Sequence, residues 1–326
     1  MEVFVTGATG FLGGRLARRL RERGDEVVAL ARAPAKAGDL QELGVRLVDG
    51  DLSDRAKLAR AMEGCDAVFH LAGIYKVGIP GRDCPEMHEA NVAGTEHVLE
   101  AAIEVGVARI VHVSTIGYFG NTHGRILKEG DPRPDGESFL SCYDETKYYA
   151  HEIAKQRMAE GAPILIAQPG GAYGPGDHSS LGNVIEQTRK GRMKALTFPE
   201  MGFNFGHVDD IVQGLLLIND KGRVGETYIL GGELSTAREL IGKVAALSGR
   251  KPPRITIPGP ILKMAIPLGP LVGKFFGTPN LREAIRSVDG VTYWATHEKA
   301  SRELGYSPRD LDTGLRDTLA ELGRPT

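Results

Sequence analysis

The stretch YDETKYY at residues 143–149 places a tyrosine and a lysine four positions apart. On a helix, Tyr143 and Lys147 would share one face. A free phenol has a pKa of about 10 and exchanges protons poorly at neutral pH, but a nearby ammonium would favour the phenolate and lower that pKa. Tyr148 and Tyr149 lack a lysine at this spacing and are expected to pack. The pair therefore predicts acid–base chemistry on a substrate oxygen.

A second chemical pattern opens the chain, MEVFVTGATGFLGGRL, where three glycines lie between a short apolar run and a helical stretch. Gly7, Gly10 and Gly13 could make a tight turn, let a pyrophosphate approach the backbone, and let the helix pack on the strand. The free N–H groups of the helix N-terminus would then face the phosphates. The order of strand, glycines and helix predicts a dinucleotide site, with a ligand-free structural turn as the alternative.

The end of the second apolar run, VVALARAP, bears on the choice of dinucleotide. An NAD site typically has an acidic residue there to hold the ribose 2′-hydroxyl, whereas this chain has Ala31 and Arg32. A guanidinium would pair with a 2′-phosphate, so NADP(H) is favoured and NAD(H) stays possible. Arg32 as a solvated loop residue is the alternative. An oxidised nicotinamide would add its positive charge to that of Lys147 beside Tyr143.

The elements that must position these residues alternate regularly along the first half of the chain. Continuous apolar strands interleaved with helices indicate a parallel sheet covered on both faces, so the predicted fold is α/β, a Rossmann doubly wound parallel sheet. Strands are expected at 3–6, 26–30, 45–48, 67–70, 109–113 and 163–168, and helices near 12–23, 55–63, 86–105 and 143–160.

The pattern changes after residue 168, where glycine- and proline-rich turns and short helices replace the alternation. A helix at 209–217 and a strand at 227–230 are expected to return to the sheet. We therefore predict an NAD(P)-binding domain over 1–170, with returns near 205–231. Residues 171–204 and 232–326 would form a smaller, mainly helical substrate-binding subdomain.

The 326 residues include 41% hydrophobic and 25% charged residues, with a formal net charge of −2. These values are ordinary for a soluble globular protein, and no long run of one sign supports a nucleic-acid or membrane-surface partner. The start of the chain has no pattern of a secretory signal, so a cytoplasmic location is expected. The apolar stretch at 257–276 is broken by prolines and lysines and is expected to form helices of a soluble subdomain.

The three cysteines, Cys65, Cys84 and Cys142, have no CxxC spacing. They are expected to be reduced thiols, without a disulfide framework or a zinc site.

Several motifs together resemble the extended short-chain dehydrogenase/reductases, or NAD(P)-dependent epimerase/dehydratase family. They are TGATGFLGG, GDLSD, HLAG, NVAGT, VHVSTIGYFG and the tyrosine–lysine pair, and they span essentially the whole chain. The loop after HLAG, with ALARAP, is most similar to the dihydroflavonol-reductase-like branch. The resemblance implies a catalytic triad of Thr115, Tyr143 and Lys147. The neighbouring Ser114 is the alternative catalytic hydroxyl and otherwise would hydrogen-bond within the loop. It implies that Asn91 ties its helix to the sheet.

The resemblance also implies the residues that contact the cofactor. Asp51 would contact the adenine amino group, and Leu52 would pack on the ring. The full predicted set is Gly7, Thr9, Gly10, Phe11, Leu12, Gly13, Arg32, Asp51, Leu52, Leu71, Ala72, Gly73, Tyr143, Lys147, Pro169 and Gly171.

Two positions depart from the nucleotide-sugar branch of the family. Gly171 stands where those enzymes usually have Asn, and Phe203 stands where they usually have Arg. The loss of an amide and a guanidinium argues against a nucleotide-sugar substrate. Substrate-lining positions are expected at Tyr75, Ser114, Tyr173 and Phe203, with ordinary core packing as the alternative.

His207, Asp209 and Asp210 suggest a metal cluster at first sight. We expect instead that Asp209 caps the following helix and that His207 packs nearby, so no metal is predicted. His70 and His112 are expected to be structural.

The leading hypothesis is an NADP-dependent oxidoreductase that transfers a hydride between nicotinamide and a carbonyl or alcohol carbon of a small molecule. A sugar or sugar-nucleotide epimerase with tightly bound cofactor and a non-catalytic NAD(P) sensor are the alternatives. The resemblance also implies a homodimer formed through the helices near 86–105 and 143–160.

Overall fold

The computed structural model describes residues 1–134, 136–264, 266–268 and 280–323. Its largest element is a sheet in the order β10-β6-β5-β4-β1-β2-β3, with every neighbouring pair parallel. This order places the topological switch point between β1 and β4. The strands are β1 (Glu2–Thr6), β2 (Glu26–Ala31), β3 (Arg46–Asp49), β4 (Ala67–His70), β5 (Arg109–Val113), β6 (Ile164–Pro169) and β10 (Thr227–Leu230).

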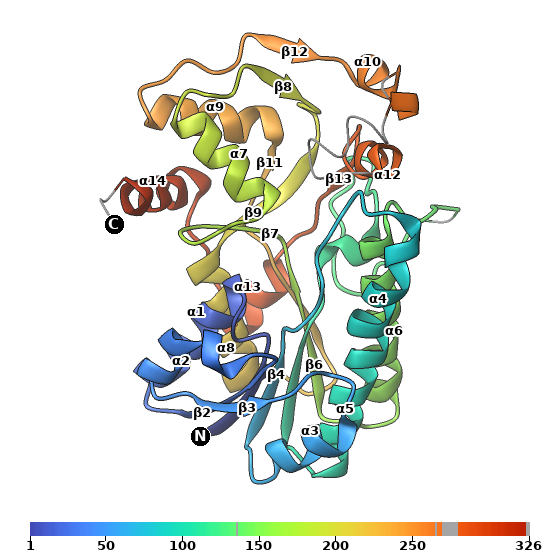
Figure 1. Cartoon of the computed structure of the whole chain (residues 1–326), viewed down its shortest axis with the longest axis vertical. Helices are drawn as coiled ribbons and strands as arrows, with labels where there is room; N and C mark the ends of the chain where they lie inside the picture. The colour runs from blue at the N-terminus through green and yellow to red at the C-terminus, as the bar shows by residue number, and fades with distance from the viewer. Residues whose placement is uncertain (135, 265, 269–279, 324–326) are drawn as a thin grey trace.

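Helices cover both faces of this sheet (Figure 1). One face packs against helices α1 (Phe11–Glu22), α2 (Gly38–Glu42), α8 (Val208–Lys221) and α13 (Glu298–Leu304), and the other against α3 (Arg55–Met62), α5 (Gly94–Glu104) and α6 (Cys142–Ala159). Burial of strands β1 and β4–β6 on both faces explains why their sequences are mostly apolar rather than alternating between apolar and polar residues. The predicted Rossmann fold is confirmed.

The helix expected near 86–105 is interrupted. It consists of α4 (Cys84–His88), a π-helical turn over Glu89–Ala93 and α5. A turn of this kind inserts an extra residue into the helix and is frequent at functional sites. Asn91 lies in the turn and is buried.

A smaller layer lies above the sheet in Figure 1. Its four-stranded sheet has the order β11-β9-β13, with β7 also paired to β9, and β8 and β12 form a separate pair. Its strands are β7 (Gly171–Tyr173), β8 (Ala195–Thr197), β9 (Gly202–His207), β11 (Glu233–Thr236), β12 (Ile255–Ile257) and β13 (Thr292–Tyr293). Its helices are α7 (Ser180–Arg189), α9 (Ala237–Leu247), α10 (Gly259–Met264), α12 (Leu281–Arg286) and α14 (Leu311–Leu322).

This layer differs in two respects from the mainly helical subdomain expected over 171–204 and 232–326. It contains the additional strands, and helix α13 packs with the large sheet through Ala300 and Leu304. Strand β9 was not predicted, because glycines and Asn204 interrupt its apolar pattern. The Asn204 amide instead hydrogen-bonds to the backbone N–H and carbonyl of Ala295 and links β9 to the chain beyond β13.

Four short helical turns complete the described structure: η1 (Pro34–Lys36), η2 (Gly81–Asp83), η4 (Ile116–Phe119) and η5 (Ile266–Leu268). Part of the apolar stretch 257–276 forms β12, α10 and η5, and the remainder of that prediction lies outside the described residues. Among the described helices, none combines the length and the hydropathy needed to cross a bilayer.

Candidate active site

The glycine turn joins β1 to α1 at the switch point of the sheet. Gly7 has φ +77°, and a Cβ there would lie 2.8 Å from the Ala72 nitrogen, so both the turn and the neighbouring chain require glycine. A Cβ on Gly13 would lie 2.1 Å from the Gly7 carbonyl oxygen, which shows how closely the helix approaches the turn. The Gly10 N–H donates to that same oxygen at 2.9 Å. These contacts match the roles expected for glycines in a dinucleotide-binding turn.

The N-terminus of α1 has the properties of an anion site. Gly10 is the N-cap and offers no side chain to the first turn, which also contains no acidic residue. Its N–H groups and the positive end of the helix dipole are therefore not neutralised by a cap. A pocket of about 510 Å³ lies beside this turn and is lined by Thr9, Gly10 and Phe11, together with Lys36. The residues present fit a dinucleotide pyrophosphate.

Arg32 and Asp51 lie at the carboxyl ends of the neighbouring strands β2 and β3. Ala31 pairs with Asp49 across these strands, and both Arg32 and Asp51 are exposed. Hydrogen bonds from Ser53 lower the pKa of Asp51, and the positive charge of Arg32 lowers it further. The structure therefore brings the two predicted adenosine-side residues to one edge of the sheet.

Residues 71–73 pass directly over the glycine turn. The Ala72 N–H donates to the Thr6 hydroxyl at 3.1 Å. From the π-helical turn, the Asn91 amide oxygen accepts from the Ile74 N–H at 2.6 Å, and its nitrogen donates to the Ile74 carbonyl and to the Thr146 hydroxyl, both at 3.0 Å. Asn91 thus connects this segment to α6, the helix that carries Tyr143 and Lys147.

Tyr143 lies in the first turn of α6, and its own surroundings favour the neutral phenol. Burial raises the pKa of Tyr143, and the charges of Tyr75 and Asp144 raise it further, while the Thr115 hydroxyl acts in the opposite direction. The edge of the exposed Tyr75 ring contacts it, with ring centroids 4.7 Å apart.

Lys147 lies one turn after Tyr143 on α6. Its ammonium donates to the Val113 carbonyl oxygen at 2.9 Å, at the end of β5. Burial lowers the pKa of Lys147 to about 8, because a charge is poorly solvated there. Lys147 is held at the carboxyl edge of the sheet.

The two adjacent hydroxyls of the β5 loop differ in their partners. The Ser114 hydroxyl is buried and lies 2.8 Å from Nδ1 of His151 on α6. The Thr115 side chain is partly exposed, accepts from the Gly117 N–H at 3.1 Å and interacts with the Tyr143 phenol. Thr115 is therefore the hydroxyl that the structure groups with Tyr143.

The first turn of α6 is fixed by a buried ion pair that the sequence did not indicate. Arg133 donates to both carboxylate oxygens of Asp144, at 2.7 and 3.0 Å, and Asp144 also accepts from the Leu140 N–H. The Ser141 hydroxyl caps the helix by accepting from the Asp144 N–H. Arg133 and Asp144 are 11 positions apart, and Arg133 lies outside α6, so no local periodicity could have revealed the pair.

The remaining predicted residues lie at different depths. Pro169 ends β6, and Gly171 begins β7. A Cβ at Gly171 would lie 3.5 Å from the side chains of Phe203 and Phe205. The Phe203 ring stacks on Tyr293 with centroids 4.7 Å apart. Tyr173 is only 1% exposed. It packs in the core of the smaller layer, which does not favour its predicted contact with substrate.

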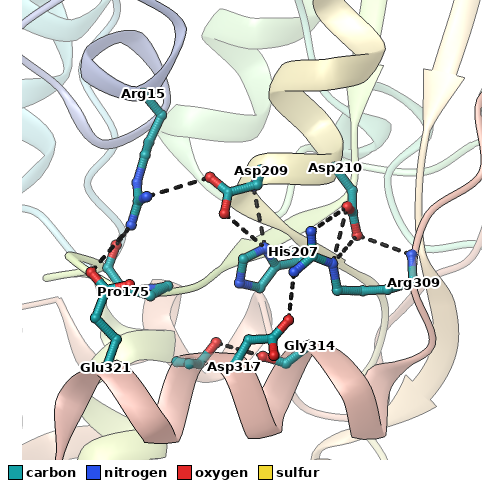
Figure 2. Close-up of polar contacts among 10 residues, drawn as sticks. Arg15, Pro175, His207, Asp209, Asp210, Arg309, Gly314, Asp317 and Glu321 are labelled. Atoms are coloured by element: carbon teal, nitrogen blue, oxygen red, sulfur yellow. Dashed lines mark hydrogen bonds and ion pairs between the residues drawn. The ribbon is translucent and has the colours of Figure 1, made fainter. Parts of the chain in front are cut away.

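His207, Asp209 and Asp210 form a structural network (Figure 2). His207, rather than Asp209, is the N-cap of α8 and accepts from the Asp209 N–H, which corrects the expected cap. Asp210 binds the Arg309 guanidinium at 2.8–3.0 Å. Arg15 of α1 pairs with Asp209 and with Glu321 of α14. The network fastens the C-terminal helix to the nucleotide-binding layer.

The cysteines depart from the expectation of three reduced thiols. Cys84 and Cys142 form a disulfide, and Cys65 is free and buried. The two half-cystines are 58 residues apart in sequence, and only the packing of α4 against α6 brings them together. His70 and His112 are buried as expected, with His70 between the hydroxyls of Thr6 and Thr95.

Comparison with known proteins gives consistent results. Residues 3–231 match the NAD dependent epimerase/dehydratase family. The chain is 32% identical to a putative dihydroflavonol 4-reductase of Synechocystis, over 97% of this chain and 93% of the relative. It is 31% identical to 4-hydroxy-2-methyl-3-oxo-4-farnesyl-3,4-dihydroquinoline-1-oxide ketoreductase of Stigmatella aurantiaca, over 99% and 97%. It superposes on the crystal structure of gox2253 with a TM-score of 0.84 at 32% identity, over 98% and 97%.

Proposed function

Because this chain belongs to the NAD dependent epimerase/dehydratase family of extended short-chain dehydrogenase/reductases, we propose that it reduces the carbonyl group of an apolar small molecule with NADPH. It is an NAD(P)-dependent enzyme of hydride transfer between nicotinamide and a carbonyl or alcohol carbon. The observation that carries the proposal is the Tyr143 phenol beside the Thr115 hydroxyl, with Lys147 one turn further along α6. The direction of reduction is supported by the relatives named as reductases.

Each member of the triad has a distinct task. Tyr143 donates its proton to the carbonyl oxygen, and a neutral phenol is the form required for that step. Thr115 donates a hydrogen bond to the same oxygen and orients it. Lys147, anchored at the Val113 carbonyl, would hold the nicotinamide ribose. The bound nicotinamide supplies the hydride.

The preference for NADP(H) rests on two cations. Arg32 is exposed at the end of β2, and Lys36 lines the pocket beside the α1 N-terminus. Both are suited to a ribose 2′-phosphate. We expect Arg32→Glu to weaken NADPH binding at least 10-fold and to spare NADH binding, measured by fluorescence titration. Tighter binding of NADH than of NADPH by the unmodified protein would contradict the preference.

The apolar substrate class rests on the aromatic side chains near the triad. Tyr75 contacts Tyr143, and Phe203 stacks on Tyr293. Gly171 and Phe203 provide neither the amide nor the guanidinium expected for binding a nucleotide diphosphate. The ketoreductase relative, whose named substrate carries a farnesyl group, is consistent with this class.

A screen of ketones and aldehydes for NADPH consumption tests the reaction. Tyr143→Phe should lower kcat at least 100-fold with little change in NADPH affinity, because it removes only the proton donor. Tyr148→Phe, on the same helix, is the matched control and should keep activity. Isomerised product with no net NADPH consumption would favour the epimerase alternative. NADPH binding without turnover of any compound would favour the sensor.

We further propose a homodimer formed through α5 and α6, and a cytoplasmic location. Light scattering tests the first, and fractionation of cells expressing the untagged chain tests the second. A monomer at micromolar concentration would contradict the dimer.

A further inference from the structure

The Cys84–Cys142 disulfide lies at the edge of the candidate active site. Cys84 is the first residue of α4 and Cys142 the first residue of α6, with Cα atoms 5.9 Å apart. This separation lies in the ordinary range for a disulfide. Cys142 immediately precedes Tyr143 in the sequence. The covalent link is therefore adjacent to the proposed proton donor.

The link joins two segments that both contribute to the site. Helix α4 continues through the π-helical turn to Asn91, which fixes the chain at Ile74 and contacts Thr146. Helix α6 carries Tyr143 and Lys147. A bond between the first residues of α4 and α6 consequently limits how far the Tyr143 turn can move relative to the turn around Asn91.

We propose that Cys84–Cys142 is a reversible redox modification site whose oxidised form holds Tyr143 in its productive position. The proposal rests on the role of Tyr143 in the proposed function. The reductant is a dithiol of the thioredoxin or dithiothreitol kind. In a reducing compartment, disulfides are usually transient and redox-sensing rather than permanent.

The exposure of the two sulfurs defines the order of the exchange. Cys84 is partly exposed, whereas Cys142 is only 9% exposed. A thiolate of the reductant attacks the Cys84 sulfur, forms a mixed disulfide and releases the Cys142 thiolate, which takes up a proton. The second thiol of the reductant then attacks the reductant sulfur of the mixed disulfide and releases Cys84, which becomes a thiol. Two electrons pass to the protein, and the reductant leaves as its disulfide.

His88 lies beside the two sulfurs. One of its ring nitrogens lies within 4.8 Å of both sulfurs, and Nε2 lies 3.7 Å from the Glu145 carboxylate. The third cysteine, Cys65, is buried and unpaired. Burial raises the pKa of its thiol to about 11, so it is a matched inert control.

Cys84, His88 and Cys142 also form a possible ligand group for a metal ion. Zinc binding would require both sulfurs as thiolates, which is incompatible with the disulfide. The disulfide and the zinc-bound thiolates therefore predict different thiol counts and different metal contents.

The experiment uses the full chain, acid-quenched and denatured for thiol titration, with metal content measured on the same sample. We expect one titratable thiol and no bound zinc after treatment with oxidised glutathione, and three thiols after dithiothreitol. Reduction should lower Tm by about 5 °C or more, because the bond closes a loop of 58 residues. It should also lower kcat for carbonyl reduction about 10-fold, with the KM for NADPH nearly unchanged.

Variants separate positioning from general stability. Cys84→Ala should behave like the reduced protein and gain nothing from reoxidation, whereas Cys65→Ala should keep the full redox response. Reoxidation of the unmodified chain should restore kcat and return the pH profile of kcat to that of the oxidised form.

Three results would overturn the proposal. These are three thiols that oxidised glutathione cannot pair, one bound zinc per chain, or equal kcat in the oxidised and reduced forms. Failure of the proposed function has a different signature: the oxidised chain would turn over no carbonyl compound, while the thiol count and the Tm shift would still report on the disulfide.

Discussion

Substitution of Gly13 tests the close approach on which the dinucleotide site depends. A Cβ at this position would lie 2.1 Å from the Gly7 carbonyl oxygen and 2.6 Å from its carbonyl carbon. Both atoms belong to the backbone of the turn, so neither can rotate away as a side chain could. Relief to ordinary van der Waals separation requires the helix and the turn to part by about 1 Å.

The neighbouring Gly14 provides the matched control. A Cβ there would lie 3.3 Å from the Ala8 carbonyl oxygen, which requires only a few tenths of an ångström of adjustment. Both substitutions gain up to about 1 kcal/mol from the higher helix propensity of alanine. Only Gly13→Ala adds an overpacking cost, typically about 1–3 kcal/mol.

We therefore expect Gly13→Ala to lower the free energy of unfolding by about 1–2 kcal/mol and to weaken NADPH binding at least 10-fold, since the displaced turn no longer presents its N–H groups correctly. Gly14→Ala should be neutral or stabilising and should bind NADPH within about 3-fold of the unmodified protein. Urea unfolding and fluorescence titration of NADPH measure both quantities. If Gly13→Ala binds NADPH as tightly as Gly14→Ala does, the inferred role of the close approach is wrong.

Three further predictions concern the residues around the triad. Arg133→Met should lower the free energy of unfolding by about 3 kcal/mol, because it leaves the buried Asp144 carboxylate without its cation; a loss below about 1 kcal/mol in urea unfolding would show that the pair is dispensable. Burial lowers the pKa of His70 and of His151 to about 3. Between pH 6.5 and 3 the unfolded chain therefore binds protons that the folded chain does not. The free energy of unfolding should then fall by about 1.4 kcal/mol for each histidine with each pH unit of acidification. His151→Asn should make that slope measurably shallower between pH 6 and 4.5, and an unchanged slope would exclude His151 as a contributor. Thr115→Val should abolish most carbonyl reduction whereas Ser114→Ala, which removes a contact to His151, should retain it; the reverse outcome would exchange the two roles.

The strands and most helices of the nucleotide-binding layer could be predicted because their signals are local. Residues 67–70, 109–113 and 227–230 form strands with the expected bounds, since a doubly buried strand must be mostly apolar. The family resemblance carried by the glycine and YxxxK motifs is likewise confirmed by the match over residues 3–231. Strand β9 could not be predicted, because glycines and Asn204 interrupt its apolar pattern and its partners β7, β11 and β13 come from separate parts of the chain.

The sequence by itself determined the residue types available to the site and their spacing within each element. The spacing of Gly7, Gly10 and Gly13 specifies a turn, and the four-residue interval of Tyr143 and Lys147 places both on one side of a helix. These relations hold within a few residues of backbone, so they can be read from the order of amino acids.

Only the tertiary structure decided which of these groups contact one another. Lys147 donates to the Val113 carbonyl 34 positions away, and burial raises the pKa of Tyr143. Cys84 and Cys142 become a disulfide because α4 packs against α6. Contacts between residues 30 or more positions apart depend on how whole elements pack, so no local pattern of the sequence encodes them.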